Sequence, residues 1–503
     1  MKRTQTPSPK TLWYGAAVIV TVIVLLIIIT PTAFAQNTTQ PPRISPLSRQ
    51  YTELLRNVFN FVEENYVDDV DPKVLYEGAI KGMLDALGDP YTTYLDASKQ
   101  RDMNDITMGS FGGVGLTITK PVESSSEKPA WVEVASPIED TPGWKAGILA
   151  GDMIISINDT PTPDISMDEV LGMLRGPVGE DVELVIRRGK NVEFPVTLTR
   201  ALIEVPTVKY GMINGNTGYL RIIEFTRYTP ERVQDALEFF ETNNYKGIII
   251  DLRNNPGGVI DSVVAVADKF IDSGIIVSTK SRIPYQNIEY SASPQNTVKS
   301  TYGIPTIVLI NKGSASASEI LAGALKDYHL AYLVGETTYG KGSVQQVLDF
   351  RGTEDGIKIT TARYYTPSDS NIDKTGIPAD MEVLFPELTS DEEKTFVDLI
   401  TSSVIQDYSA EHPDMSEEQI SAYAKKLAKE YPLEERLLRR LIRQEQYRKK
   451  TSPLYDLDYD IQLQKALSLI GQTNFSDMVK SAETIRELQM KAQAESETAE
   501  AEE

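Results

Sequence analysis

The stretch of residues 304–345 limits most strongly what this chain can fold into. An apolar run at 304–311 ends in a Lys-Gly turn, and a run of small residues starting at Ser314 reads as the beginning of a helix. A second apolar run at 331–334 leads to a lysine between two glycines at 340–342. Continuous apolar runs bounded by turn residues are typical of strands buried on both faces. The stretch therefore predicts strand, turn, helix and strand, with serines at the helix start.

The same alternation extends over residues 201–385. We expect a strand at 219–223, an amphipathic helix at 230–243 and a second buried strand at 247–252. A sharp Asn-Pro-Gly-Gly turn and another helix, at 259–271, follow. Strands that alternate with helices predict crossover units in a mixed sheet, so the fold class is α/β within a chain of several domains.

The segments on either side of this region differ from it in composition. Apolar residues at helical spacing predict a helical region over 46–105. Glycine turns and alternating apolar residues over 106–200 predict a small β-rich domain. Charged helical patterns fill 386–490, and the final residues, 491–503, are acidic and poor in hydrophobics, so we expect them to be disordered.

Part of the C-terminal region is interpreted as an insertion. Residues 386–450 form the charged helical segment, and the more apolar 454–469 is expected to return and pack on the α/β core. Helical regions at both ends of the chain are candidates for contacts in a homo-oligomer or with an adaptor.

The N-terminal residues 1–35 have the pattern of a targeting segment. A basic start precedes an uncharged apolar run at 12–29, and an Ala-x-Ala pattern ends at Ala35. Two interpretations remain open: a cleaved signal peptide and an uncleaved membrane anchor. A polar linker follows at 36–45. Both interpretations keep the positive N-terminus inside, so the rest of the chain is expected to be extracytoplasmic, periplasmic or at the cell surface.

Composition excludes several classes of function. The net charge of −22 argues against nucleic acid and anionic lipid headgroups as partners. The absence of cysteine excludes a thiol nucleophile and Cys-based zinc sites. The chain has only two histidines, His329 and His412. We therefore expect no metal site built from histidines and no cofactor that is held by such a site.

The serine-bearing turn and the lysine suggest hydrolytic chemistry. A serine at a helix N-terminus lies beside free backbone N–H groups, which can stabilise a developing oxyanion. An alcohol is a weak nucleophile and needs a base, and Lys341 can serve as one only when it is desolvated and neutral. Gln345 could hold the amine by a hydrogen bond without adding a negative charge.

The same residues allow two other interpretations. Gly335-x-x-x-x-Gly340-Lys341 matches most of a nucleotide-binding loop, but Gly342 stands where a metal-binding hydroxyl is required, and 343–350 alternates like a strand. A purely structural interpretation treats Ser314 as a helix cap. It remains open, although it gives the Gly-Lys-Gly and Asn-Pro-Gly-Gly turns no purpose.

Five motifs within residues 46–385 make the resemblance specific. The chain resembles the carboxy-terminal processing proteases, the Ser-Lys peptidases of family S41 that carry an embedded PDZ domain. The motifs are Phe111-Gly-Gly-Val-Gly-Leu, Asp251-Leu-Arg-Asn-Asn-Pro-Gly-Gly, Ser314-Ala-Ser-Ala-Ser-Glu-Ile, Tyr339-Gly-Lys-Gly and Gly376-Ile-Pro-Ala-Asp. The resemblance implies a protease core of the ClpP/crotonase type over 201–385 and a PDZ domain over 106–200.

The resemblance also implies roles for individual residues. The nucleophile would be Ser316, the general base Lys341 and the supporting amide Gln345, with no metal or cofactor. The oxyanion hole would comprise the N–H of Ala317 and that of Gly257 or Gly258.

The implied partners are polypeptides with apolar C-terminal tails. In a PDZ domain the loop that enters the first strand binds the terminal carboxylate through its backbone N–H groups. The loop residues here are Gly113, Val114, Gly115 and Leu116. The alternative function is a non-catalytic PDZ scaffold of the cell envelope, which would bind tails without cutting them and would not need Lys341.

Overall fold

The computed structural model describes residues 45–121, 129–138, 140–189, 192–447 and 453–502. The chain divides into two compact units, one ending at Met83 and one beginning at Leu84. The predicted signal peptide or anchor at 1–35 lies outside the described residues. In the part of the chain that the structure describes, no helix is both long enough and apolar enough to cross a membrane.

The described residues of the first unit are mostly helical, as predicted for the region that starts at residue 46. It contains α2 (Pro46–Asn65) and most of α3 (Pro72–Asp85). Helix α2 begins at Pro46 because the Ser45 side chain accepts a hydrogen bond from the Ser48 N–H, 3.0 Å away, and because proline is favourable at the first helical position.

The core of the second unit is a six-stranded sheet in the order β10-β11-β12-β15-β16-β19. The five strands from β11 onward run parallel, and β10 pairs antiparallel with β11. The strands are β10 (Val208–Ile213), β11 (Thr217–Ile222), β12 (Gly247–Asp251), β15 (Thr306–Ile310), β16 (Tyr332–Gly335) and β19 (Met381–Glu382). Strands β12 and β15 are buried along their whole length, which explains their uninterrupted apolar sequences.

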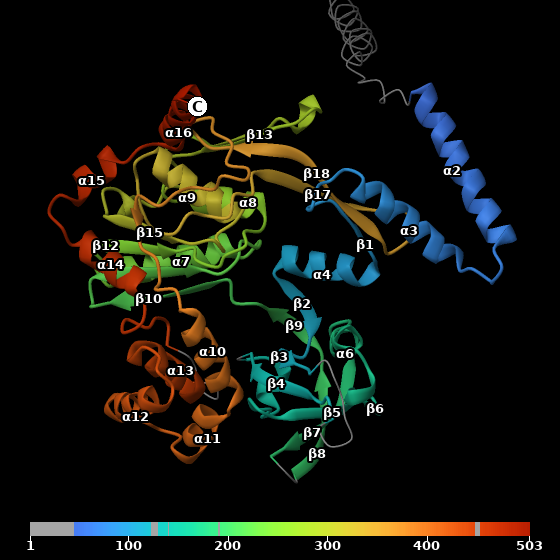
Figure 1. Cartoon of the computed structure of the whole chain (residues 1–503), viewed down its shortest axis with the longest axis horizontal. Coiled ribbons are helices and arrows are strands. Elements are labelled where there is room, and N and C mark those ends of the chain that lie inside the picture. The colour runs from blue at the N-terminus through green and yellow to red at the C-terminus, as the bar shows by residue number, and fades with distance from the viewer. Residues whose placement is uncertain (1–44, 122–128, 139, 190–191, 448–452, 503) are drawn as a thin grey trace, which may run out of the picture. The chain divides into compact units, whose positions relative to one another are not determined.

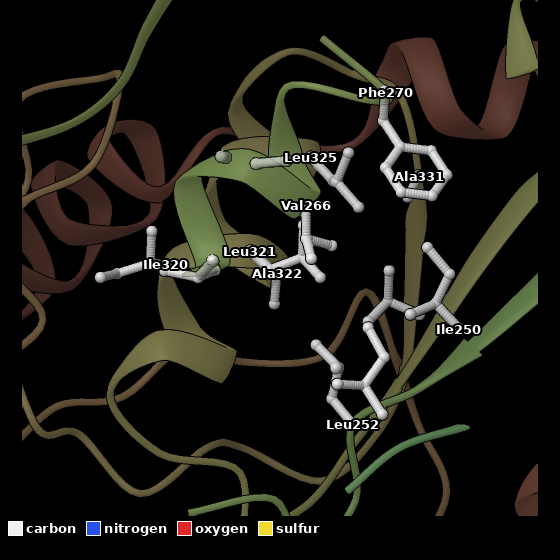
Figure 2. Packing of buried hydrophobic residues seen from close by; sticks show 14 of the residues in the cluster. Ile250, Leu252, Val266, Phe270, Ile320, Leu321, Ala322, Leu325 and Ala331 are labelled. Atoms are coloured by element: carbon white, nitrogen blue, oxygen red, sulfur yellow. The ribbon is translucent and has the colours of Figure 1, made fainter. Parts of the chain in front are cut away.

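Each face of this sheet packs against its own set of helices. Alternate residues such as Ile250 and Val308 pack against α7 (Thr229–Thr242), α8 (Ile260–Ala267) and α9 (Ala317–Asp327). Figure 2 shows this cluster from close by. The other face, with Ile249 and Leu309, packs against α14 (Ile461–Ile470) and α15 (Phe475–Ser481). The predicted return of 454–469 to the core is therefore confirmed.

A second, antiparallel sheet carries the strand that follows Lys341. Its strands are β1 (Thr93–Leu95), β13 (Gly274–Lys280), β14 (Glu289–Ala292), β17 (Ser343–Asp349) and β18 (Gly356–Tyr365). The prediction of a purely helical 46–105 was incomplete, because β1 pairs with β18 before α4 (Ala97–Met108) begins. A strand of three residues is too short to show a periodicity in the sequence.

The β-rich region encloses a separate apolar core. Its sheet consists of β3 (Leu116–Thr119), β4 (Val132–Pro137), β5 (Met153–Ile157), β6 (Thr160–Pro161), β7 (Asp181–Arg188) and β8 (Val192–Thr199). Helices α5 (Pro142–Lys145) and α6 (Met167–Leu174) accompany it, and α6 contributes Val170 and Leu174 to the core. On either side of this region, β2 (Ser110–Gly113) and β9 (Ala201–Glu204) pair antiparallel.

The described residues of the C-terminal region are mostly helical. Its remaining helices are α10 (Ser390–Thr401), α11 (Val404–Glu411), α12 (Glu417–Glu430), α13 (Glu435–Tyr447) and α16 (Ile485–Glu502), and the first four enclose an apolar cluster of their own. The expectation of disorder over 491–503 was wrong for the described residues, because α16 continues to Glu502. Alanine, glutamate, glutamine and lysine are strong helix formers, so a lack of apolar residues does not prevent a helix.

Short 3-10 helices complete the second unit. They are Thr162–Asp164, Pro284–Gln286 and Lys299–Thr301. Figure 1 shows α8 and α9 beside strands β12 and β15. Helix α9 begins at Ala317, a short loop after β15 ends at Ile310, so its start follows the carboxyl end of that strand.

The core predicts a large difference between two leucines that are close in sequence. Leu333 on β16 is 0% exposed, whereas Leu330 in the preceding turn is 39% exposed. We expect Leu333→Ala to lower the free energy of unfolding by about 2–5 kcal/mol, because it leaves a cavity, and Leu330→Ala to lower it by less than about 1 kcal/mol. Thermal or denaturant unfolding of the two variants measures this. Equal losses would mean that β16 is not part of the packed core.

Candidate active site

Three neighbouring parallel strands each end in a loop that carries one of the predicted functional groups. Residues 252–258 follow β12, residues 311–316 follow β15, and residues 336–342 follow β16. Because the carboxyl ends of parallel strands meet at one edge of a sheet, the oxyanion glycines, Ser316 and Lys341 are all placed at that edge.

The three serines of the helix start differ in what their hydroxyl groups do. The hydroxyl of Ser314 donates to the carbonyl of Leu252 at 2.8 Å, and that of Ser318 donates to the carbonyl of Asn255 at 3.0 Å. Both side chains are fully buried, whereas Ser316 is only half-buried. The outer two serines therefore fix the turn to the loop after β12, and Ser316 is the one that solvent or a substrate can reach.

The backbone of Ser316 is strained. Its φ angle is +54°, in a region that favours glycine, and such a conformation costs about 1–3 kcal/mol unless the surroundings hold it. Two contacts do so: the Ser316 N–H donates to Glu319 Oε2 at 2.8 Å, and the Tyr364 hydroxyl donates to the Ser316 carbonyl at 3.3 Å. The serine is thus held at a sharp bend before α9.

Gly257 and Gly258 lie where only glycine fits. A Cβ on Gly257 would come within 2.8 Å of the Ser316 Cβ and 2.9 Å of the Ala317 nitrogen, and one on Gly258 would come within 2.1 Å of the Phe225 carbonyl oxygen. Both residues also have positive φ angles, +107° and +139°. The loop after β12 therefore passes directly against the predicted nucleophile and the first N–H of α9.

The two glycine N–H groups are not equivalent. The Gly257 N–H donates to the Asn255 side chain at 2.9 Å. Phe225 forms a parallel β-bridge with Gly258. Its N–H donates to the Gly257 carbonyl, and its carbonyl accepts from the Val259 N–H. In such a bridge the N–H of Gly258 points away from Phe225. Among the described residues no acceptor for the Gly258 N–H is found, which makes it better suited than Gly257 to bind an oxyanion.

A buried carboxylate that the sequence reasoning missed joins the serine and lysine loops. Glu319 Oε2 accepts from the N–H of Ser316 at 2.8 Å and from that of Lys341 at 2.9 Å. Its Oε1 accepts from the Gly340 N–H at 2.7 Å and from the Thr338 hydroxyl at 2.6 Å. Because Oε2 accepts both hydrogen bonds, the distance between the backbone nitrogens of Ser316 and Lys341 cannot exceed the sum of the two donor–acceptor distances.

The environment of Lys341 lowers the pKa of its amine. Burial lowers the pKa of Lys341, and the nearby positive charge of Lys358 lowers it further, while Glu319 and Asp89 act in the opposite direction. The Nζ atom lies 5.1 Å from the centre of the Tyr91 ring.

Strand β17 begins at Ser343, directly after Lys341 and Gly342. A nucleotide-binding loop would start a helix at this position, so that interpretation of the sequence does not fit the fold.

Gln345 lies on β17 and is hydrogen-bonded within its own sheet. Its Nε2 donates to the hydroxyls of Ser343, at 2.9 Å, and Thr360, at 3.2 Å. Among the described residues no hydrogen bond joins Gln345 to Lys341, nor the Ser316 hydroxyl to the lysine Nζ. The structure therefore brings the serine and lysine loops together through Glu319, and leaves Gln345 bonded to its own sheet.

The predicted peptide-binding loop connects β2 to β3. Gly115 has a φ angle of +72°, and its carbonyl accepts from the Ile138 N–H at 2.9 Å, so the carbonyl side of the loop is anchored within its own domain. Strand β3 is at the edge of its sheet and pairs only with β4 among the described strands, which leaves one edge for an added peptide strand. Arg175, at the end of α6, pairs with Asp105 at 3.1 Å.

Three regions of the chain match known protein families. Residues 216–383 match the sequence profile of peptidase family S41, residues 133–188 that of a PDZ domain and residues 33–99 that of the activating protease CtpB N-terminal domain. The carboxy-terminal-processing protease of Bartonella bacilliformis is 40% identical over 343 residues, which cover 67% of this chain and 76% of that protein. This chain belongs to peptidase family S41.

Other members of the family are similar over a comparable length. The carboxy-terminal processing protease CtpA of Bacillus subtilis is 32% identical over 352 residues, covering 68% of this chain and 72% of that protein. A solved structure of a photosystem II D1 C-terminal processing protease is 30% identical and covers 66% of this chain and 92% of its own, with a TM-score of 0.40. The S41 peptidase described here is thus a carboxy-terminal processing protease of the serine type with a PDZ domain.

Glu319 carried a signal that sequence reasoning could have used. Ser316 and Glu319 stand three residues apart at a helix start, the spacing of a capping box, which predicts that the glutamate accepts from the serine N–H. Tyr91 and Tyr364 carried no such signal, because each is far from Lys341 and Ser316 in the sequence and reaches them only in the fold.

Replacing Glu319 by glutamine tests its role as the link between the two loops. Glutamine keeps the shape but turns one acceptor oxygen into an NH2 donor that faces N–H groups. We expect proteolytic activity to fall by at least about tenfold, and the melting temperature to fall by several degrees, because a misplaced site and an unpaired buried donor are both costly. Glu336→Gln, a change of the same kind at a half-buried residue in the loop after β16, is the control and should have little effect. Unchanged activity in Glu319→Gln would contradict the link.

Proposed function

We propose that this S41 peptidase cuts polypeptides with a Ser-Lys mechanism, in which Ser316 is the nucleophile and Lys341 the general base. The observation that carries the proposal is the sharing of Glu319 Oε2 by the Ser316 and Lys341 N–H groups, because it fixes two loops with complementary chemistry side by side. The partial exposure of the Ser316 residue and the lowered pKa of Lys341 support the same assignment.

The proposed reaction has two stages. The neutral Nζ of Lys341 takes the proton of the Ser316 hydroxyl while its Oγ attacks the scissile carbonyl carbon, and the N–H groups of Ala317 and Gly258 stabilise the oxyanion. The tetrahedral intermediate collapses as the protonated lysine gives its proton to the leaving amine, so that the C–N bond breaks and an ester on Ser316 remains. Water, deprotonated by the same lysine, then hydrolyses the ester.

Gln345 is proposed as the support of the lysine amine. Its amide nitrogen is already held by Ser343 and Thr360, so the carbonyl end of the same amide is the part that can accept from Nζ. A neutral acceptor orients the amine without the rise in pKa that a carboxylate would cause.

The proposed substrates are polypeptides with apolar C-terminal tails, captured on the open edge of β3 and by the loop of Gly113, Val114, Gly115 and Leu116. The proposed location is outside the cytoplasm, supported by the apolar run at 12–29 and the positive residues before it.

The mechanism is tested by digestion of casein, an unstructured protein. We expect cleavage by the wild type and a loss of at least about a thousandfold in both Ser316→Ala and Lys341→Ala, because each removes a group needed for bond cleavage. Equal cleavage by all three proteins would overturn the assignment. Binding of tails without cleavage in the wild type would favour the PDZ scaffold, the alternative from the sequence.

The pH dependence of the reaction reports on Lys341. Activity should rise as pH increases through the pKa of Lys341, because only the neutral amine is a base, and the rise should occur below the pH at which free lysine deprotonates. Lys358→Glu replaces a repelling charge by an attracting one, and should move the rise in kcat/KM to higher pH by about one unit. Lys246→Glu makes the same charge change at an exposed residue and is the control. A profile that does not move in Lys358→Glu would exclude Lys341 as the group that titrates.

Capture of the tail carboxylate is tested with two matched peptides. We expect Ser316→Ala to bind a labelled peptide with a free apolar C-terminus at least about tenfold more tightly than the same peptide with an amidated end, because hydrogen bonds to a charged acceptor are the stronger ones. Fluorescence anisotropy measures both affinities. Equal affinities would show that the loop does not recognise the carboxylate.

A further inference from the structure

Arg253 links the oxyanion loop to a distant part of the chain. Its guanidinium donates to both oxygens of Asp251, at 2.9 and 2.6 Å, and to both oxygens of Asp460, at 2.8 and 2.6 Å. Asp251 and Arg253 begin the motif that ends at Gly258, whereas Asp460 stands at the start of α14. The bond between Arg253 and Asp460, which stand 207 positions apart, therefore connects the C-terminal segment to the loop that carries the oxyanion glycines.

The two carboxylates have different effects on Arg253. Asp251 is 1% exposed and also accepts from the Tyr219 hydroxyl at 2.7 Å, so it is fixed within the sheet. Asp460 reaches Arg253 from the C-terminal segment, where the Gln462 side chain adds a third acceptor at 3.0 Å. Bidentate pairing sets the orientation of a guanidinium as well as its charge environment. Asp460 thus limits how Arg253 can lie.

The loop after Arg253 is hydrogen-bonded to the turn that carries Ser316. Asn254 has a φ angle of +58°, and its N–H donates to the Asn311 side chain at 2.9 Å. The carbonyl of Asn255 accepts from the Ala315 N–H at 3.0 Å, and its side chain accepts from the Gly257 N–H at 2.9 Å. A shift of Arg253 would therefore act on a short segment, held by hydrogen bonds at Asn254, Asn255 and Gly257, that ends at Gly258.

We infer that Asp460 is a positioning residue for the reaction: by clamping Arg253 against Asp251, it holds the oxyanion loop against Ser316. The C-terminal segment that packs on the core is then part of the catalytic apparatus, although it lies outside residues 216–383, which match the peptidase family. This inference rests on the proposed Ser316 chemistry and adds a residue to it that does not touch the substrate.

Asp460 also has a structural role, which the choice of variant must preserve. Its Oδ1 accepts from the Leu463 N–H at 2.9 Å and so caps α14. Asparagine caps helices about as well as aspartate, so Asp460→Asn keeps the cap and removes the charge that holds Arg253. Asp458 provides a matched control, because it lies two residues earlier and pairs with Arg439, at 2.7 Å, and with Arg443, at 2.8 Å, on α13.

The experiment compares kcat and KM for cleavage of casein or a labelled peptide by the wild type, Asp460→Asn, Asp460→Glu, Asp458→Asn and Ser316→Ala. We expect Asp460→Asn to lower kcat by at least about tenfold with KM within about twofold of the wild type, because a displaced oxyanion donor weakens the transition state more than the bound substrate. Asp460→Glu restores the charge and should recover part of kcat. Asp458→Asn should match the wild type.

Two results would overturn the inference. One is a kcat of Asp460→Asn within about twofold of the wild type. The other is an equal loss in Asp458→Asn, which would show a general loosening of the C-terminal segment. Thermal unfolding of each variant verifies that it is folded. Activity that survives in Ser316→Ala would instead overturn the proposed nucleophile, and this inference with it, so the two failures are distinguishable.

Discussion

The geometry of this site depends on one buried carboxylate. Glu319 is fully buried, and a charge in such a place is stable only when donors surround it. Four donors do so, and all of them belong to the serine turn or to the loop that carries the lysine. Burial raises the pKa of Glu319, which these hydrogen bonds oppose. The energetic need of the carboxylate for donors is thus what holds the two loops in register.

The parallel sheet explains why a few long-range hydrogen bonds are enough to hold the three loops of the site together. Strands β12, β15 and β16 are neighbours, so the loops that follow them start side by side. Each loop then needs only local fixing: Ser314 and Ser318 anchor to the loop after β12, and Glu319 anchors the loop after β16. The strain at Ser316 is sustained because its N–H and carbonyl are both bonded. The proposed chemistry follows from the order of the strands.

Sequence reasoning predicted the parts of the fold that rest on hydrophobic pattern and missed those that rest on long-range contact. The strands at 247–252 and 304–311 are continuous apolar runs, and they lie buried at the centre of the sheet. The three-residue β1 had no periodicity to detect, and the helical end of α16 was misjudged because hydrophobic content was weighed above helix propensity.

In the candidate site, too, some features could be predicted from local sequence and others depend on long-range contacts. The turn and the helix start around Ser316 were expected from the motif, but the roles of Ser316 and Lys341 came from the resemblance rather than from spacing. The bonds of Gln345 to Ser343 and Thr360, and the approach of Tyr91 to Lys341, depend on how β17 and β1 lie on β18, which a single sequence does not encode in a readable pattern.

The pairing of β2 with β9 has a consequence for how such a chain can evolve. Because Ser110 lies opposite Glu204 and Gly113 opposite Ala201, the chain leaves the β-rich region within a few ångströms of where it entered. A module whose two ends are adjacent can be gained, exchanged or lost in one genetic event without stretching the scaffold that hosts it. The PDZ domain and the peptidase core are therefore free to change independently, so the proposed preference for a tail can vary while the cleavage site stays the same.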